Sequence, residues 1–106
     1  MQLVKKVIYK GWNCNLNKSY YFARPVLAEE SGRVALTLED ADDGEPISTC
    51  TVNLPDEPLG EGEVFIKDYS ENEGMVEFLV KEGVVERTGR EVQSGYISVP
   101  VCKLLV

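Results

Sequence analysis

The sequence predicts an α+β fold, a mainly antiparallel β-sheet with one α-helix at about residues 70–82 packed on one face. Two patterns lead to this prediction. Short runs of β-branched and aromatic residues are separated by turn residues, and one later stretch has apolar residues at helical spacing. The chain has 106 residues, of which 43% are apolar and 27% are charged. This size and composition are typical of a globular domain, so we expect residues 1–106 to form a single domain.

The first strands are expected near the N-terminus. Residues 3–10 are rich in β-branched and aromatic side chains, and a turn is expected at 11–13. A second run covers residues 18–27 and contains Pro25. Because proline cannot donate to a β-ladder, Pro25 predicts an edge strand or a bulge. Residues 29–32 have the composition of a turn.

The middle of the chain predicts a hairpin followed by a broken segment. Residues 34–39 alternate in side-chain type with the period of a half-buried strand. Residues 40–46 combine Asp, Gly and Pro in the clearest turn of the chain, and a Thr-rich strand is expected at 47–54. Residues 54–62 contain too many Pro and Gly for regular structure, and 63–68 allow one short strand.

The helix is predicted to begin at Ser70 and to stop at Gly83. The tetrapeptide at 70–73 has the form of a capping box, in which the Ser70 hydroxyl accepts from the amide of Glu73 and the Glu73 carboxylate reaches back. The apolar face then consists of Met75, Phe78 and Leu79. After a polar stretch that includes residues 87–90, we expect one final strand at roughly 94–104.

Charge is strongly segregated along the chain. Residues 29–73 carry fourteen Asp or Glu and two basic residues, whereas residues 1–28 carry five Lys or Arg and no acid. The net charge of the whole chain is −7. Such a field attracts cationic surfaces and repels nucleic acid, which predicts a basic protein partner and no direct contact with nucleic acid. Acidic turns also keep small proteins soluble, so recognition and solubility both remain open interpretations.

The acidic residues of the expected hairpin and of the broken segment are the candidates for partner binding. Alternate residues of an extended chain lie about 6.6–6.8 Å apart, which is comparable with the charge spacing of an extended polyanion. A fixed carboxylate array would therefore fit a groove that normally holds nucleic-acid phosphates. The candidate residues are Glu39, Asp40, Asp42, Asp43, Glu57, Glu61 and Glu63. Glu71 and Glu73 are left out because capping the helix already accounts for them.

Several chemistries are excluded or unsupported. The chain contains no histidine, which removes Ser-His-Asp and Cys-His nucleophile systems and the usual zinc sites. A calcium loop starting at Asp40 needs Gly at its sixth position and Glu at its twelfth, but Gly44 is the fifth residue and Thr51 the twelfth. Residues 60–63 are Gly-Glu-Gly-Glu and could be taken for a glycine-rich phosphate-binding loop, but the two glutamates would repel phosphate. We therefore predict no enzyme, no cofactor and no metal site.

The remaining features concern the cell compartment and the basic residues. No stretch approaches the ~20 apolar residues of a membrane helix, and the N-terminus lacks the apolar segment of a signal peptide. Three cysteines without a C-x-x-C motif are typical of free packing thiols in a reducing cytoplasm, so we expect no membrane contact and a cytoplasmic location. Residues 18–24 interleave basic and aromatic residues, as single-strand binding surfaces do, although sheet packing explains them as well. The basic residues that would contact nucleic acid in that alternative are Lys5, Lys6, Lys10, Lys18 and Arg24.

The second half of the chain resembles a known group of proteins. The similarity lies in Thr-Val-Asn-Leu-Pro at 51–55, in the segment at 64–74, in Thr-Gly-Arg at 88–90 and in Gln-Ser-Gly-Tyr at 93–96. Together they resemble a family of small proteins of unknown function that are similar to accessory proteins of phages, plasmids and conjugative elements. The resemblance covers residues 51–104 and brings no catalytic residues with it. It implies genomic context and not chemistry.

This context and the charge together lead to two hypotheses. Small acidic proteins of mobile elements are often inhibitors of host defence, and CRISPR effectors hold nucleic acid in strongly basic channels. The first hypothesis is a cytoplasmic, anti-CRISPR-like inhibitor that binds the basic surface of a defence nuclease as a DNA mimic. The alternative is a non-catalytic interaction module of a conjugative element that contacts nucleic acid through its basic N-terminal strands.

Overall fold

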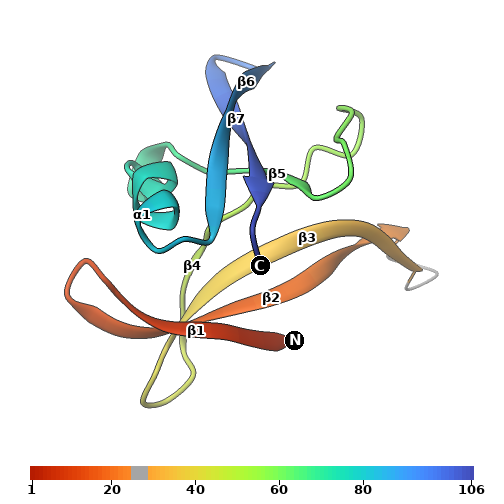
Figure 1. Ribbon diagram of the computed structural model, residues 1–106. Helices are drawn as coiled ribbons and strands as arrows, with labels where there is room; N and C mark the ends of the chain where they lie inside the picture. Colours follow the sequence, from red (N-terminus) through yellow and green to blue (C-terminus); the bar gives the residue numbers. More distant parts are fainter. Residues whose placement is uncertain (25–28) are drawn as a thin grey trace.

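Two antiparallel sheets and one α-helix enclose the apolar core in this computed structural model (Figure 1). The structure describes the backbone of residues 1–24 and 29–106, and the side chains of residues 1–21 and 32–106. The prediction for Pro25 lies outside the described residues. The predicted fold class is confirmed, because antiparallel strands dominate and a single short α-helix is present in the described part of the chain.

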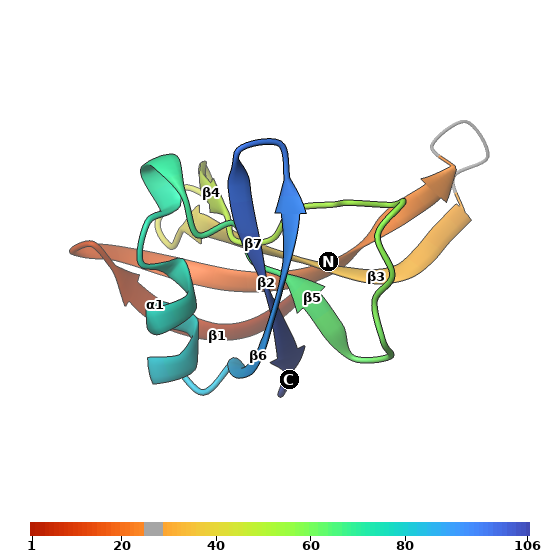
Figure 2. The same ribbon diagram turned by 90° about the horizontal axis from the view of Figure 1, so that it is seen from above.

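The strands form a sheet of four and a sheet of three. The first sheet has the order β1-β2-β3-β4, with β1 at Gln2–Tyr9, β2 at Trp12–Arg24, β3 at Glu29–Asp40 and β4 at Pro46–Thr49. The second sheet has the order β5-β7-β6, with β5 at Glu63–Phe65, β6 at Val85–Ser94 and β7 at Ile97–Leu104. Seen from above, the β6–β7 hairpin crosses the long strands of the first sheet at a steep angle (Figure 2).

The β1–β2 hairpin is tighter than predicted. Tyr9 pairs with Trp12, and the two residues between them, Lys10 and Gly11, have φ of 49° and 83°. Positive φ at both central residues is the geometry of a type I′ turn, which matches the twist of the flanking strands. The turn predicted at 11–13 is therefore wrong by one residue at its start and two at its end, and Trp12 belongs to β2.

The turn predicted at 29–32 is also wrong, because β3 already runs through these residues. Between the pair Tyr20–Val34 and the pair Phe22–Glu30, β3 uses more residues than β2, so β3 bulges there. Gly32, with φ of 79°, supplies the left-handed backbone of this bulge. A glycine that reads as a turn in the sequence is here a kink within a strand.

The predicted hairpin at 40–46 is confirmed, with the Asp40 amide bonded to the Glu45 carbonyl at 2.8 Å. The strand after it is shorter than the predicted 47–54, because the chain leaves the first sheet after Thr49. The amide of Cys50 still donates to Leu36 at 2.8 Å, but Thr51 pairs with Ile66 beside the second sheet. Residues 54–62 are irregular, as predicted.

The capping box at Ser70 is wrong. Ser70 has a φ of 55° and opens a 3₁₀ turn, η2 (Ser70–Asn72), which has no side-chain cap. Gly74, with φ of 91°, then separates η2 from the α-helix α1 (Met75–Lys81). Positive φ at Ser70, the first residue of η2, and at Gly74 prevents one continuous helix from 70 to 82. The cap that α1 does receive comes from Asp68, whose Oδ1 accepts from the Val76 amide at 3.3 Å.

The end of the helix is as predicted. Gly83 has a φ of 73°. Its amide donates to the carbonyl of Val80 at 3.0 Å, and the amide of Val84 donates to Leu79 at 2.9 Å. These two bonds form a Schellman motif, which needs a left-handed residue and so favours glycine.

The C-terminal third holds two strands where one was predicted. The polar stretch around 87–90 is part of β6, which turns through Gly95 and Tyr96 into β7. Residues 86–91 are all exposed, because β6 is an edge strand that projects from the molecule. Because none of these six residues is buried, this part of the strand shows no apolar alternation from which a strand could be predicted.

The core lies between the two sheets and α1. Its main cluster joins Leu16, Leu36 and Leu38 of the first sheet to Ile66, Met75 and Leu79 from the second half of the chain. All six are at most 1% exposed. Among the described residues, α1 is the longest helix, and no helix has the length and apolar character needed to cross a membrane.

Candidate protein-binding site at the acidic hairpin

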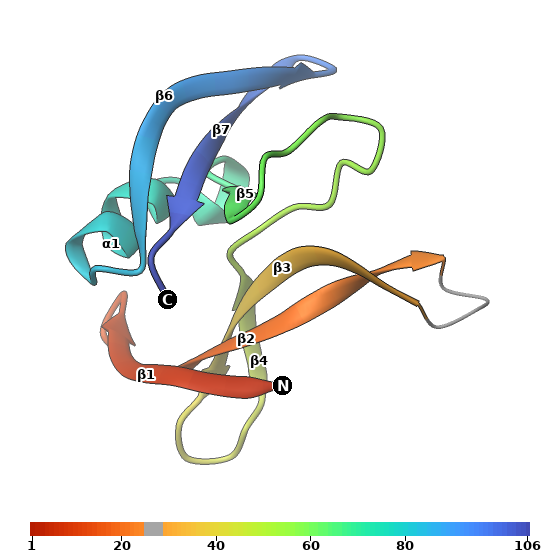
Figure 3. The ribbon, with the colours of Figure 1, turned by 45° about the vertical axis from the view of Figure 1, so that its right-hand side comes forward.

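The structure separates the seven predicted partner-binding residues into two groups. Glu39, Asp40, Asp42 and Asp43 lie at the tip of the β3–β4 hairpin, whereas Glu57, Glu61 and Glu63 lie in or beside the irregular segment 54–62. In Figures 1 and 3 the hairpin tip projects beyond one end of the first sheet, and segment 54–62 lies at the opposite end. The seven carboxylates therefore do not form one continuous array.

At the hairpin tip, some carboxylates shape the turn and others face water. Asp40 Oδ1 accepts from the Asp42 amide at 2.8 Å, and Asp43 Oδ1 accepts from the Glu45 amide at 2.9 Å. These are Asx turns, in which an Asp side chain fixes the backbone two residues later. Asp42 and Glu45 are exposed. The backbone is thus fixed by two carboxylates while two others are presented to solvent.

Glu39 sits at the base of this hairpin and is partly engaged. Its Oε1 accepts from Asn15 Nδ2 at 3.3 Å, across the β2–β3 pair. Glu45 was not among the predicted site residues. Its side chain makes no hydrogen bond or ion pair in the described structure and is exposed.

Segment 54–62 is tied down by cationic side chains. The Arg33 guanidinium, from the bulge of β3, donates to the carbonyls of Leu54 and Glu57, both at 2.6 Å. Glu63 forms an ion pair with Arg90 and accepts from the Gly60 amide at 2.8 Å. The bond from Arg90 and then the bond from Gly60 lower the pKa of the Glu63 carboxyl. Glu63 therefore has an internal partner, whereas Glu61 is exposed and Glu57 is half-buried.

The N-terminal lysines are largely used inside the molecule. Lys5 donates to the carbonyl of Glu82 at 3.0 Å, and also pairs with its carboxylate at 3.2 Å. Lys10 donates to the carbonyl of Glu71 at 2.8 Å, and Lys18 to that of Val106 at 3.2 Å. Three of the five basic residues of the alternative hypothesis thus fasten the first sheet to the second half of the chain. Lys6 is exposed, and the side chain of Arg24 lies outside the described residues.

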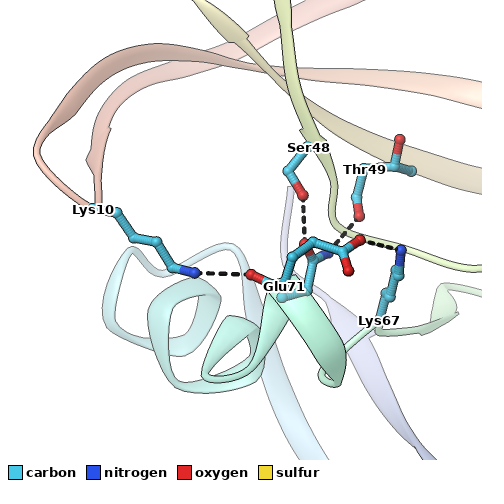
Figure 4. A network of polar contacts seen from close by, with 6 residues as sticks. Lys10, Ser48, Thr49, Lys67 and Glu71 are labelled. Carbon is cyan, nitrogen blue, oxygen red and sulfur yellow. Dashed lines mark hydrogen bonds and ion pairs between the residues drawn. The ribbon is translucent and has the colours of Figure 1, made fainter.

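A polar network joins β4 to η2 beside the hairpin (Figure 4). Ser48 donates to Asn72 Oδ1 at 2.6 Å, and Asn72 Nδ2 donates to the carbonyl of Thr49 at 2.7 Å. Asn72 is only 1% exposed, so these bonds satisfy a buried amide. Lys67 pairs with Glu71 at 2.5 Å, which raises the pKa of the Lys67 ammonium and lowers that of the Glu71 carboxyl.

This network forms one wall of a small hollow. The hollow has a volume of about 200 Å³ and is lined from the strand side by Tyr9, Trp12 and Ile47. Trp12 is 55% exposed, whereas Tyr9 is 7% exposed, packs edge-on against Phe78 and has a hydroxyl without a hydrogen-bond partner in the described structure. The sequence placed Trp12 in a turn, so its exposure beside the acidic hairpin was not foreseen.

Two further hollows are more open or of mixed charge. One, of about 720 Å³, lies on another side of the hairpin tip, where Asp42 faces Lys6, Lys81 and Glu82. Another, of about 350 Å³, lies beside the bulge of β6, where Arg87 and Arg90 oppose Asp68 and Glu91. Neither hollow concentrates one sign of charge.

The three cysteines are buried and free. Burial raises the pKa of Cys50 to about 12 and also raises the pKa values of Cys14 and Cys102. Their thiols therefore stay protonated at neutral pH, and a protonated thiol is a poor nucleophile and a poor metal ligand. Among the described side chains, no three Cys, Asp or Glu are grouped closely enough to hold a metal ion.

Comparison with known proteins adds no relative to this picture. No family model matches the chain, and neither a curated protein nor a solved structure matches it. The charge, exposure and packing of the described residues are therefore the basis of any functional argument.

Proposed function

We propose that this protein is a non-enzymatic, cytoplasmic inhibitor carried by a phage or another mobile element, and that it binds the basic nucleic-acid surface of a host defence nuclease of the CRISPR type. The acidic hairpin is the part that makes this contact. The protein acts by occupying the surface and repelling the nucleic acid that normally binds there.

One observation carries the proposal. Residues 39–45 hold five carboxylates and no basic residue, on a turn whose backbone is fixed by two internal Asx bonds. A rigid display of like charge destabilises the fold through self-repulsion, and it speeds encounter with a basic surface. Glu57 and Glu61, at the other end of the molecule, are a secondary contact at most.

The test is inhibition by a charge-neutralised hairpin. The variant Asp42→Asn with Glu45→Gln removes two exposed tip carboxylates that make no Asx bond, and it keeps the Asx residues that shape the turn. Inhibition of the nuclease, measured as cleavage of its DNA or RNA target, should be lost in this variant. The matched control is Glu77→Gln with Glu91→Gln, which removes the same charge from exposed positions on α1 and β6. Full inhibition by the hairpin variant would contradict the proposal.

Salt and nucleic acid provide two independent checks. Binding to the partner should weaken as ionic strength rises, because exposed charges are screened. In a gel-shift assay the protein should bind neither single-stranded nor double-stranded DNA. A shifted band would instead support the conjugative-element module that contacts nucleic acid through its basic strands, and Lys6→Glu would then be the variant to examine.

A further inference from the structure

The hollow beside Trp12 has the size of one side chain. Its volume of about 200 Å³ lies below the ~300–1,000 Å³ of pockets that hold drug-sized ligands. It lies between the β1–β2 hairpin, β4 and η2, next to the base of the acidic hairpin, since the carbonyl of Asn13 bonds the amide of Ala41 at 2.9 Å. A partner that docks on the acidic hairpin therefore reaches this hollow.

Trp12 gives the hollow an aromatic rim. The indole is 55% exposed although it pairs with the buried Tyr9, because it stands at the first position of β2. Large exposed aromatic residues beside a small pocket are typical centres of protein interfaces. Tryptophan is also the side chain whose ring face attracts cations most strongly.

One polar group of the hollow has unused acceptor capacity. The Tyr9 hydroxyl is buried and cannot be reached by a partner, so the acceptor is Ser48. The Ser48 hydroxyl donates its hydrogen bond to Asn72, and the lone pairs of its oxygen can still accept one. A ligand group that only donates, and that is flat enough to lie on an indole, matches this wall.

The shape and hydration of the cation decide between arginine and lysine. Lys10 lines the hollow, but its ammonium is bound to the carbonyl of Glu71 at 2.8 Å and lies over the Tyr9 ring. The negative charges of Glu71 and of the exposed carboxylates at the hairpin tip counter the positive charges of Lys10 and Lys67. Guanidinium is planar, donor-only and more weakly hydrated than ammonium, so it stacks on aromatic faces at lower cost.

We infer that the hollow beside Trp12 accepts an arginine side chain of the partner, with the guanidinium stacked on the indole and donating to the Ser48 hydroxyl oxygen. This inference rests on the proposed function, because it takes the partner surface to be basic. It adds to it a preference for arginine over lysine that charge alone does not produce.

The experiment uses the whole protein and two peptides. Trp12 is the chain's single tryptophan, so its fluorescence reports on this site alone. Hexa-arginine and hexa-lysine are titrated at low salt, with affinity measured by calorimetry and Trp12 emission recorded in parallel. Hexa-arginine should change the emission and bind about three- to tenfold more tightly than hexa-lysine, the range expected for a stacked cation at a partly exposed site.

Variants separate the hollow from the charge. Trp12→Ala should lower the affinity for hexa-arginine to that for hexa-lysine and leave hexa-lysine unchanged, while Trp12→Phe should keep part of the preference. Tyr96→Ala is the matched control, since Tyr96 is a fully exposed aromatic on the remote β6–β7 turn. Ser48→Ala provides a second variant that leaves the aromatic rim intact and should also reduce the preference.

The outcomes distinguish the two proposals. Equal affinities for the two peptides, with no change in Trp12 emission, would overturn the arginine site. The acidic hairpin would still stand if Asp42→Asn with Glu45→Gln weakened both peptides equally. Absence of binding by either peptide would contradict the proposed function itself, and the arginine site with it.

Discussion

The two acidic segments of this chain have the same sign of charge and opposite roles in the structure. The hairpin tip at 40–45 is held by its own Asp side chains, and Asp42 and Glu45 are left exposed. Segment 54–62 is held by cations from elsewhere: Arg33 binds two of its carbonyls, and Arg90 pairs with Glu63 at its end. A dense run of acidic residues is therefore no measure of how much negative charge is available to a partner.

The positive charges of the N-terminal lysines are likewise used largely by contacts within the molecule. Lys5, Lys10 and Lys18 each donate to a backbone carbonyl in the second half of the chain. The segregated charge of the sequence is in part a complementarity within the molecule. What remains for a partner is the charge that no such contact uses.

The largest expected effect is the release of segment 54–62 in Arg33→Ala. The guanidinium makes two hydrogen bonds to carbonyls in a half-buried position, and losing bonds from a charged donor should lower the free energy of unfolding by about 2–3 kcal/mol. Urea unfolding measures this loss, and faster amide exchange at 54–62 locates it. Arg33→Lys keeps the positive charge but loses the two-pronged guanidinium, so its free energy of unfolding should lie between those of Arg33→Ala and the unchanged protein. A loss below about 0.5 kcal/mol would mean that the segment is held by other contacts.

The next effect is the loosening of the hairpin tip in Asp40→Ala with Asp43→Ala. Each substitution removes one hydrogen bond that the side chain accepts from the amide two residues later. Exposed hydrogen bonds of this kind contribute about 1 kcal/mol each to the free energy of unfolding. We expect a loss of about 1–2 kcal/mol in urea unfolding, with faster exchange confined to the turn. Asp40→Asn with Asp43→Asn keeps an acceptor oxygen and should restore most of the stability. If the Asn variant were as unstable as the Ala variant, charge and not turn geometry would be responsible.

A smaller effect should appear in the pH dependence of stability. Arg90 and the Gly60 amide lower the pKa of Glu63 in the folded protein from its ordinary value of 4.5. The unfolded chain therefore binds a proton at Glu63 more readily than the folded protein does. The stabilisation is complete at pH values above the ordinary pKa and is lost as pH falls through the lowered pKa of the folded protein. Unfolding followed from pH 7 to pH 3 should show this loss, and Glu63→Gln should remove that part of the curve. Glu91→Gln, an exposed change on β6, is the control and should leave the curve unchanged.

The smallest effect on stability is expected for Asp42→Asn with Glu45→Gln. Neither side chain makes a hydrogen bond or ion pair in the described structure, so the free energy of unfolding should stay within about 0.5 kcal/mol. This result is what makes the variant a clean test of binding. A loss above 1 kcal/mol would show that the tip carboxylates also support the fold, and that the two acidic segments differ less than their contacts indicate.

Prediction from the sequence succeeded where the cause is local. The turn at 40–46 and the helix stop at Gly83 depend on residues within a few positions, and both are confirmed. The capping box at Ser70 is local as well, yet it failed because Gly74 takes a left-handed conformation that interrupts the helix. Strand β6 was not predicted because its residues 86–91 are all exposed and show no alternating apolar pattern.

The candidate site was predicted only in part, for the same reason. Its hairpin carboxylates follow from composition, but Trp12 was assigned to a turn, and Tyr9 and Asn72 gave no signal. The hollow that they line joins residues about sixty positions apart, from β1, β4 and η2. Residue spacing in a single sequence does not predict which distant residues come together in the fold.

By itself the sequence determined the fold class, the acidic hairpin turn and the segregation of charge, because each depends on residue type and on neighbours a few positions away. Only the tertiary structure decided which charges are free. Arg33 meets Leu54, Arg90 meets Glu63 and Lys10 meets Glu71 across long stretches of chain. Strand pairing within the second sheet brings Arg90 to Glu63, and tertiary packing brings the other two pairs together. That packing leaves Asp42 and Glu45 in water beside Trp12, and it makes one end of the molecule the candidate binding site.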